Sequence, residues 1–175
     1  KFRARSCGIL TSISTVMADN PLLNVRLDDF NDVNQPTRII LDSNLRIVGE
    51  ENVLKLPGKK YIYTLKKDHN DPQIRSIIRT TKEVNGRIAL LDVMKDLGSD
   101  KMNEVLIEAG SVLNGALLKE NLIDEIVLYL APCFLGDKAK GMFDLPILNE
   151  MAEKYDFKIN DVSQIGPDIK VILRK

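Results

Sequence analysis

Three short polar stretches carry side chains that could do chemistry, and each follows an apolar run. They are Thr11–Thr15 with Asp19 close behind, Asp42–Ser43, and Glu108–Ser111 leading to Gly115. Open α/β sheets bind ligands just beyond the carboxyl ends of their strands. If the apolar runs are strands of one sheet, these stretches mark a ligand site along one edge of that sheet.

The third stretch has the most specific chemistry. Gly110 would let the backbone approach a ligand closely, and the free amides of a following helix would face an anion such as a nucleotide pyrophosphate. A plain turn between a strand and a helix explains the same pattern equally well. The spacing also differs from the GxGxxG dinucleotide fingerprint. Glu108 is harder to explain structurally, because a lone carboxylate ending the apolar run EVLI is costly unless it is paired or faces a ligand.

Composition excludes several classes of protein. The 175 residues fit one domain, and 25 basic against 25 acidic residues argue against a general nucleic-acid binder. No apolar run reaches the roughly 20 residues of a membrane span. Because His69 is the only histidine, any metal site would have to rely almost entirely on carboxylates, which argues against a zinc enzyme. We expect His69 to be exposed and inert. Cys7 and Cys133 form no disulfide framework and are interpreted as buried small hydrophobic residues. The opening KFRARSCGIL is not a signal peptide, which favours a cytoplasmic protein.

The elements that must position these residues alternate between strands and helices. Helices are predicted over residues 88–97 and from 111 onward, and a polar surface loop over 26–35. Strands are predicted over residues 7–13, 37–41, 60–65, 74–79, 104–108, 126–131, 157–162 and 169–173. This order predicts an α/β fold, with a mostly parallel central sheet flanked by helices and a C-terminal antiparallel hairpin as its edge.

Five segments together resemble one enzyme family across nearly the whole chain. They are TSISTVMADNPLLNVR (11–26), RIILDS (38–43), EAGSVLNGALL (108–118), DEIVLYLAPCFLG (124–136) and IGPD (165–168). The chain is similar to the reductase domain of the bifunctional riboflavin-biosynthesis deaminase-reductase, which has a dihydrofolate-reductase-like fold. The resemblance implies NADPH-dependent reduction of 5-amino-6-(5-phosphoribosylamino)uracil to its ribitylamino form, and it implies a homodimer.

The resemblance also implies roles for individual residues. Glu108 would orient the substrate and is the candidate catalytic group. Arg3, Leu23 and Arg26 would contact the substrate, and the two arginines would grip its phosphate as bidentate forks. The positions that would contact the cofactor are Thr15, Asp19, Ser43, Gly110, Ser111, Val112, Leu113, Asn114, Gly115 and Ala116.

The chain departs from the family pattern at Asn20, Ser111, Cys133 and Lys140. The family's deaminase zinc motifs do not occur in these residues, and a strand and a lysine near the chemistry are expected before the position of Lys1. We therefore expect residues 1–175 to be one N-terminally incomplete reductase domain with little turnover alone. Two alternatives remain open: a stand-alone reductase of a related pyrimidine or folate-like substrate, and a non-catalytic nucleotide-binding or assembly module of the same fold.

Overall fold

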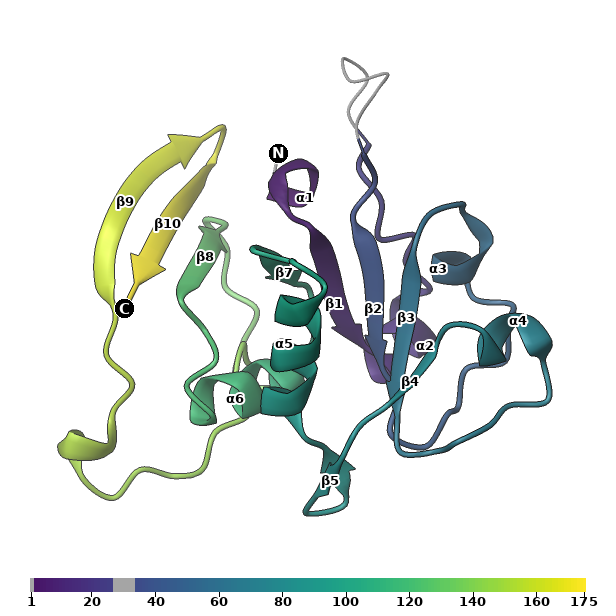
Figure 1. Cartoon of the computed structure of the whole chain (residues 1–175). Coiled ribbons are helices and arrows are strands. Elements are labelled where there is room, and N and C mark those ends of the chain that lie inside the picture. The colour runs from purple at the N-terminus through teal and green to yellow at the C-terminus, as the bar shows by residue number, and fades with distance from the viewer. Residues whose placement is uncertain (1, 27–33) are drawn as a thin grey trace.

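Five parallel strands form the central sheet of this computed structural model, which describes residues 2–26 and 34–175 (Figure 1). Their order across the sheet is β4-β3-β2-β1-β7. The strands are β1 (Gly8–Ser12), β2 (Thr37–Leu41), β3 (Lys60–Thr64), β4 (Ile78–Thr80) and β7 (Val105–Ile107). All four pairings are parallel, so the carboxyl ends of β2, β1 and β7 lie next to one another.

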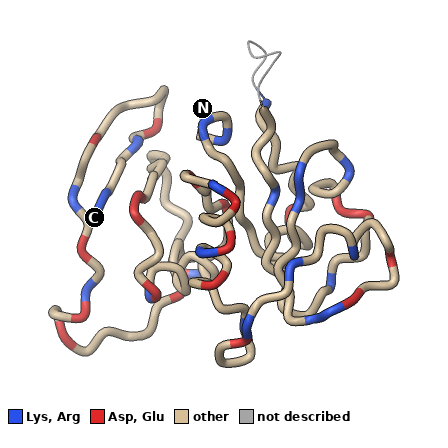
Figure 2. Tube along the Cα trace, in the orientation of Figure 1, with Lys and Arg blue, Asp and Glu red and all other residues tan. Residues whose placement is uncertain are grey.

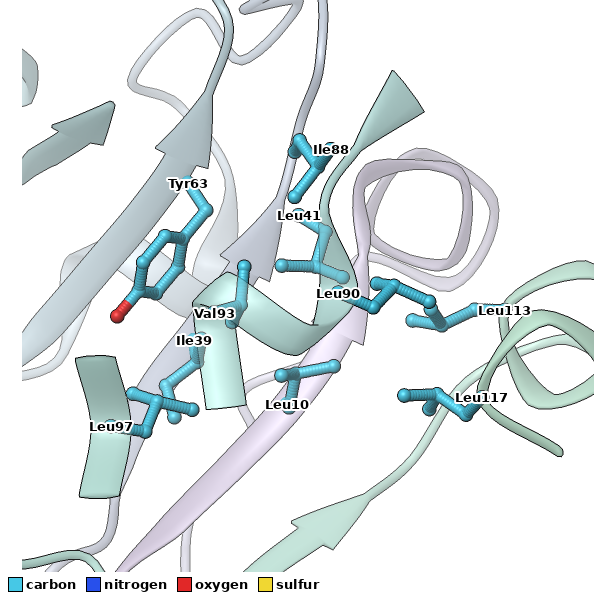
Figure 3. Close-up of a cluster of buried hydrophobic side chains, with 10 residues drawn as sticks. All are labelled: Leu10, Ile39, Leu41, Tyr63, Ile88, Leu90, Val93, Leu97, Leu113 and Leu117. Carbon is cyan, nitrogen blue, oxygen red and sulfur yellow. The ribbon is translucent and has the colours of Figure 1, made fainter. Parts of the chain in front are cut away.

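The central strands are apolar because both faces of the sheet are covered. β2, with the sequence TRIIL, is buried at every position, and β1 at four of its five. Neighbouring residues point to opposite faces, so Leu10 and Ile39 enter one core cluster while Ile9 and Ile40 enter the other. Figure 3 shows the first cluster, in which strand side chains meet those of two helices.

Helices cover the two faces of the sheet. Side chains of α5 (Leu90–Ser99) and α6 (Ser111–Lys119) belong to the cluster around Leu10. Side chains of α2 (Ile13–Asp19), α3 (Asn52–Lys55) and α4 (Pro72–Arg75) belong to the cluster around Ile9. The remaining short elements are α1 (Phe2–Arg5), the β5–β6 hairpin (Glu83–Val84 and Arg87–Ile88) and the 3-10 helix η1 (Met151–Glu153).

The C-terminal strands form a sheet of their own. β8 (Glu125–Leu130), β9 (Lys158–Ile165) and β10 (Asp168–Arg174) pair antiparallel in the order β8-β10-β9. The predicted hairpin turns at Gly166, whose φ of 60° suits glycine. The hairpin does not extend the parallel sheet as expected, because β10 takes β8 as its second neighbour.

Helix caps shift one predicted boundary and split one predicted strand. The strand predicted over residues 7–13 ends at Ser12, because the Ser12 side chain accepts a hydrogen bond from the Thr15 amide and α2 begins at Ile13. The predicted strand 74–79 is split: Asp71 caps α4, Pro72 occupies its first turn, and β4 begins only at Ile78.

The exposure of three side chains differs from the prediction. Cys7 and Cys133 are exposed rather than buried. His69 is half-buried, and its Nδ1 accepts a hydrogen bond from the Asp71 amide. Most of the predicted 26–35 loop lies outside the described residues. Basic and acidic residues are both spread along the whole chain (Figure 2). In the described ranges, no helix is long and apolar enough to cross a bilayer, and no three His, Cys, Asp or Glu residues cluster as metal ligands would.

Candidate functional site

A cleft of about 2200 Å³ runs along the carboxyl ends of β2, β1 and β7. The three polar stretches singled out from the sequence all line it. All but two of the predicted site residues also do so; the lining includes Arg3, Thr15, Asp19, Leu23, Ser43, Glu108, Gly110, Ser111, Val112, Leu113, Asn114 and Ala116. The parallel topology therefore gathers segments more than 90 residues apart around one opening.

The start of α6 forms one side of the cleft. Gly110 precedes the helix, is exposed, and provides no side-chain cap for the first-turn amides. A Cβ added to Gly110 would meet nothing within 4 Å, so the backbone is open to a ligand here. Asn114 Nδ2 donates to the carbonyls of Ala109 and Met142, 3.2 Å from each, and fixes the preceding turn. Unsatisfied amides and the positive end of a nine-residue helix suit an anion such as a pyrophosphate.

The other side of the cleft carries hydroxyl groups and a carboxylate. Thr15 Oγ1 lies 3.2 Å from Ser12 Oγ in the first turn of α2. Asp19 is the last residue of α2 and is exposed. Ser43 follows β2, and its carbonyl accepts a hydrogen bond of 3.2 Å from the Leu65 amide. The Thr15 and Ser43 side chains therefore lie beside the open end of the sheet, where they can donate to a ligand.

Glu108 is paired with Arg3 at the end of β7. Arg3 Nε donates to Oε1 at 2.7 Å and Nη2 to Oε2 at 2.6 Å, while Nη1 donates to the Asn24 carbonyl at 2.9 Å. The hydrogen bond to Glu108 raises the pKa of Arg3. The pair explains how an apolar strand can end in a carboxylate. It also occupies the face of the Arg3 fork that was expected to grip a phosphate.

Leu23 lies in a backbone conformation that a leucine rarely adopts. Its φ is 47°, and its side chain is 2% exposed. A bulky residue at positive φ costs on the order of 1–3 kcal/mol, and such strain clusters at ligand sites. Here it turns the chain so that the next carbonyl, that of Asn24, accepts from Arg3. The sequence carries no signal for this conformation.

Arg26 and Gly115 lie outside the lining. Arg26 is exposed at the edge of the described residues. Gly115 is buried, and a Cβ there would overlap the backbone of Asp144. The structure thus accounts for Gly115 by close packing of α6 against residues 140–144 and does not place it against the cleft.

Arg46 is a cleft residue that the sequence does not single out. Its Nη2 lies 3.5 Å from Ser14 Oγ, and its Nε lies 3.9 Å from Asp42 Oδ1. The Asp42 side chain has no exposed surface, and its Oδ2 accepts from the Ile47 amide at 2.9 Å. Asp42 Oδ1 has no hydrogen-bond partner among the described residues. Burial raises the pKa of Asp42 above its ordinary value.

Comparison with known proteins gives consistent matches. The family model described as the RibD C-terminal domain matches residues 1–171. A protein of Buchnera aphidicola subsp. Acyrthosiphon pisum named 5-amino-6-(5-phosphoribosylamino)uracil reductase is 39% identical over 99% of this chain and 88% of its own length. Riboflavin biosynthesis protein RibD of Escherichia coli K12 is 34% identical over 95% of this chain and 48% of its own length.

A solved structure agrees with the sequence matches. Acinetobacter baumannii RibD superposes with a TM-score of 0.83 at 33% identity, over 99% of this chain and 48% of that one. The chain therefore spans about half the length of the RibD proteins and most of the length of the Buchnera reductase.

Proposed function

The chain belongs to the RibD C-terminal domain family, and on that basis we propose that it reduces 5-amino-6-(5-phosphoribosylamino)uracil to 5-amino-6-(5-phosphoribitylamino)uracil with NADPH. The observation that carries this proposal is the 39% identity, over 99% of the chain, to a relative named for that reductase activity. The cleft supports it, because residues that the resemblance assigns to cofactor and substrate line the same opening.

The cofactor would lie across the carboxyl ends of β1 and β7. The first turn of α6, entered through Gly110, would hold its pyrophosphate with backbone amides. Thr15, Asp19 and Ser43 would contact its remaining polar groups from the other side. Bound there, NADPH supplies the hydride for the reduction.

The substrate would lie between α2 and the end of β7. Glu108 would accept hydrogen bonds from the substrate, and Arg3 holds both carboxylate oxygens in position. In this arrangement Arg3 is a positioning residue for Glu108, and Leu23 contributes an apolar contact. Arg26 is proposed as the phosphate-binding arginine, because Glu108 already binds the Arg3 guanidinium.

The direct test measures cofactor binding and turnover on the same preparation. NADPH binding is followed by nicotinamide fluorescence, and NADPH oxidation at 340 nm is followed with the phosphoribosylaminouracil as substrate. Saturable binding and substrate-dependent oxidation support the proposal. Absence of binding at millimolar NADPH would favour the non-catalytic module. Oxidation only with a different pyrimidine or a folate-like substrate would favour the other reductase.

We also propose that the chain forms a homodimer. Leu128 and Leu130 of β8, Val162 of β9, and Ile169 and Val171 of β10 point to the same side of the C-terminal sheet, as their register shows. We call these five residues the C-terminal apolar face. Leu130, Val162 and Ile169 are 47%, 57% and 45% exposed. In relatives twice as long, a deaminase domain accompanies this one, as the resemblance implies.

A further inference from the structure

Thr11 carries a buried hydroxyl group that has no partner among the described residues. The residue lies one position before the end of β1 and is 0% exposed, and its Oγ1 takes part in no hydrogen bond there. A buried hydroxyl group without a hydrogen bond destabilises a protein, because it has lost its bonds to water. Valine has nearly the same shape and would avoid this cost. The Thr11 hydroxyl group therefore needs an acceptor within reach.

The strand register places Thr11 beside Glu108. Leu10 pairs with Ile107 across β1 and β7, and the Glu108 amide donates to the Leu10 carbonyl at 3.0 Å. The next residues along are Thr11 on β1 and Glu108 just beyond the end of β7. Neighbouring strands lie about 4.8 Å apart, and residues opposite each other in register point to the same face of the sheet.

The face that these two side chains share is the one covered by α2. Thr11 is two residues from Ile9 on the same strand, so both point to that face, where Ile9 and Leu23 belong to one core cluster. Leu23 is a proposed substrate contact, and Glu108 lines the cleft. Thr11 lies beneath them without exposed surface. It can therefore act on a substrate only through a neighbouring side chain.

Glu108 has acceptor capacity left for this hydroxyl group. Arg3 Nε donates to Oε1 at 2.7 Å and Nη2 to Oε2 at 2.6 Å. Each carboxylate oxygen has two lone pairs, so acceptor positions remain after Arg3 is bound. A substrate donor and the Thr11 hydroxyl group can both use them. A second donor from the protein would restrict the rotation of the Glu108 carboxylate.

Asp42 is the other acceptor near Thr11. Its Oδ1 also lacks a partner among the described residues, and it follows β2, which is the other neighbour of β1. Thr11 pairs with Ile40, so Asp42 is offset by two residues and lies at the diagonal distance of about 7–8 Å. Glu108 is directly opposite Thr11 and is therefore the nearer acceptor.

We infer that the Thr11 hydroxyl group donates a hydrogen bond to the Glu108 carboxylate in the substrate complex and so positions Glu108 for the substrate. Thr11 is then a positioning residue of the reductase site. This inference rests on the proposed function, because it concerns the same substrate site.

The test measures substrate binding in the presence of NADP⁺, which cannot reduce the substrate. Isothermal titration with 5-amino-6-(5-phosphoribosylamino)uracil gives the dissociation constant. Thr11→Val should raise this constant about tenfold and leave the NADPH dissociation constant within about twofold. Thr11→Ser keeps the hydroxyl group, so both constants should stay within about threefold of wild type. Thr37→Val is the matched control, because Thr37 is a buried threonine at the start of β2 and outside the cleft lining; both constants should stay unchanged.

Double variants identify the acceptor. Because Thr11 acts through the Glu108 carboxylate, adding Thr11→Val to Glu108→Gln should raise the substrate constant by less than about twofold. A further tenfold rise would show that Thr11 acts independently of Glu108 and would overturn the inference. A Thr11→Val effect that disappears in Asp42→Asn, but persists in Glu108→Gln, would assign the hydroxyl group to Asp42 and would also overturn it.

The single variants decide the inference as well. An unchanged substrate constant in Thr11→Val overturns it, and so does an equal loss in Thr11→Ser, which would show an effect of packing. If Thr11→Val does not fold, Thr11→Ala is compared with Thr11→Ser, because these two differ only in the hydroxyl group. Each of these results leaves the proposed function intact, whereas a wild-type protein that binds no substrate overturns the proposed function as well.

Discussion

At the scale of single residues, the Arg3–Glu108 pair changes how the site works. The family resemblance predicts that both residues contact the substrate, but their bidentate contact with each other cannot be predicted from positions 105 residues apart. An arginine that already holds a carboxylate positions that carboxylate, whereas a free one would bind a phosphate. The two predicted substrate residues therefore act as one unit.

Glu108→Gln tests that unit. The variant keeps the shape of the side chain but loses the charge that Arg3 holds, so the substrate KM should rise about tenfold or more while the NADPH dissociation constant stays within about twofold. The free energy of unfolding should fall by only about 0.5–1 kcal/mol, because both side chains are roughly 30% exposed. Steady-state kinetics and urea unfolding measure these quantities. Glu104→Gln, which breaks the Arg5 pair before β7, is the control; an equal rise in KM there would contradict the assignment.

Gly110→Val tests whether the cofactor pyrophosphate approaches the backbone closely at Gly110. The new side chain meets nothing within 4 Å in the protein, and the φ of −78° suits valine, so the variant should fold with a free energy of unfolding within about 0.5 kcal/mol of wild type. The added methyl groups would stand where the pyrophosphate approaches. We expect the NADPH dissociation constant to rise about tenfold, or about 1.4 kcal/mol. Unchanged NADPH affinity in the folded variant would mean that the turn is only structural.

Asp42 should make stability depend on pH in an unusual direction. Burial raises its pKa above the ordinary value of 3.8, so the folded protein binds this proton more tightly than the unfolded chain. The contribution of Asp42 to the free energy of unfolding should then fall as pH rises from 3.8 through the folded pKa. Urea unfolding of wild type and Asp42→Asn across this pH range isolates the contribution of Asp42. The free energy of unfolding of wild type minus that of the variant should decrease as pH rises. A difference that increases would show a lowered pKa of Asp42 and would contradict the prediction.

At the scale of elements, the first turns of α6 are held in place by residues 140–144, which come after β8 in the chain. The Asp144 amide donates to the Ser111 carbonyl at 2.9 Å, and the Met142 carbonyl accepts from Asn114. Gly115 permits this contact because it has no side chain. Residues 140–144 thus hold the first turns of the helix that is proposed to bind the pyrophosphate.

Gly115→Ala should therefore loosen the site through packing. Its methyl group would overlap the Asp144 backbone, and forcing the segments apart should cost about 1–3 kcal/mol of unfolding free energy. Urea unfolding of this variant is compared with that of Gly98→Ala, a helical glycine whose added Cβ would meet nothing within 4 Å. A Gly115→Ala protein as stable as wild type, with NADPH affinity alone reduced, would instead favour the direct cofactor contact that the family resemblance implies.

Sequence patterns located the strands well and the caps poorly. The prediction for the run TRIIL matches the observed bounds of Thr37–Leu41, because the apolar residues Ile39–Leu41 that end it are typical of a strand covered on both faces. The run 74–79 misled because Asp71 and Pro72, just before it, start a helical turn instead. The positive φ of Leu23 and the Arg46 contacts arise only from tertiary structure, so no local pattern indicates them.

At the scale of the whole molecule, the chain exposes more surface than a compact monomer of its mass. A compact monomer of 19.7 kDa should expose roughly 8,600 Å², but this chain exposes 11749 Å². The excess lies toward the C-terminus. Residues 119–175, all of which the structure describes, include no fully buried side chain, and 13 of the 18 large exposed apolar residues lie between Tyr129 and Ile169.

The proposed homodimer would cover this surface with a second copy of the chain. The excess of roughly 3,000 Å² per chain is more than enough for a stable dimer interface, which buries about 1,200–2,000 Å² in total. In the dimer, the C-terminal apolar face of one copy would be buried against the same face of the other copy.

Val162→Lys should separate the dimer. Val162 is 57% exposed on the edge strand β9 of the C-terminal apolar face, and a lysine there would bring two like charges into an apolar interface. Sedimentation equilibrium at micromolar concentration should give twice 19.7 kDa for wild type and 19.7 kDa for the variant. Ile165→Lys, three residues along β9 and on the opposite side of the sheet beside Asp168, is the matched control and should remain dimeric. A wild-type monomer would disprove the homodimer, and loss of the dimer in Ile165→Lys alone would assign it to the other side of this sheet.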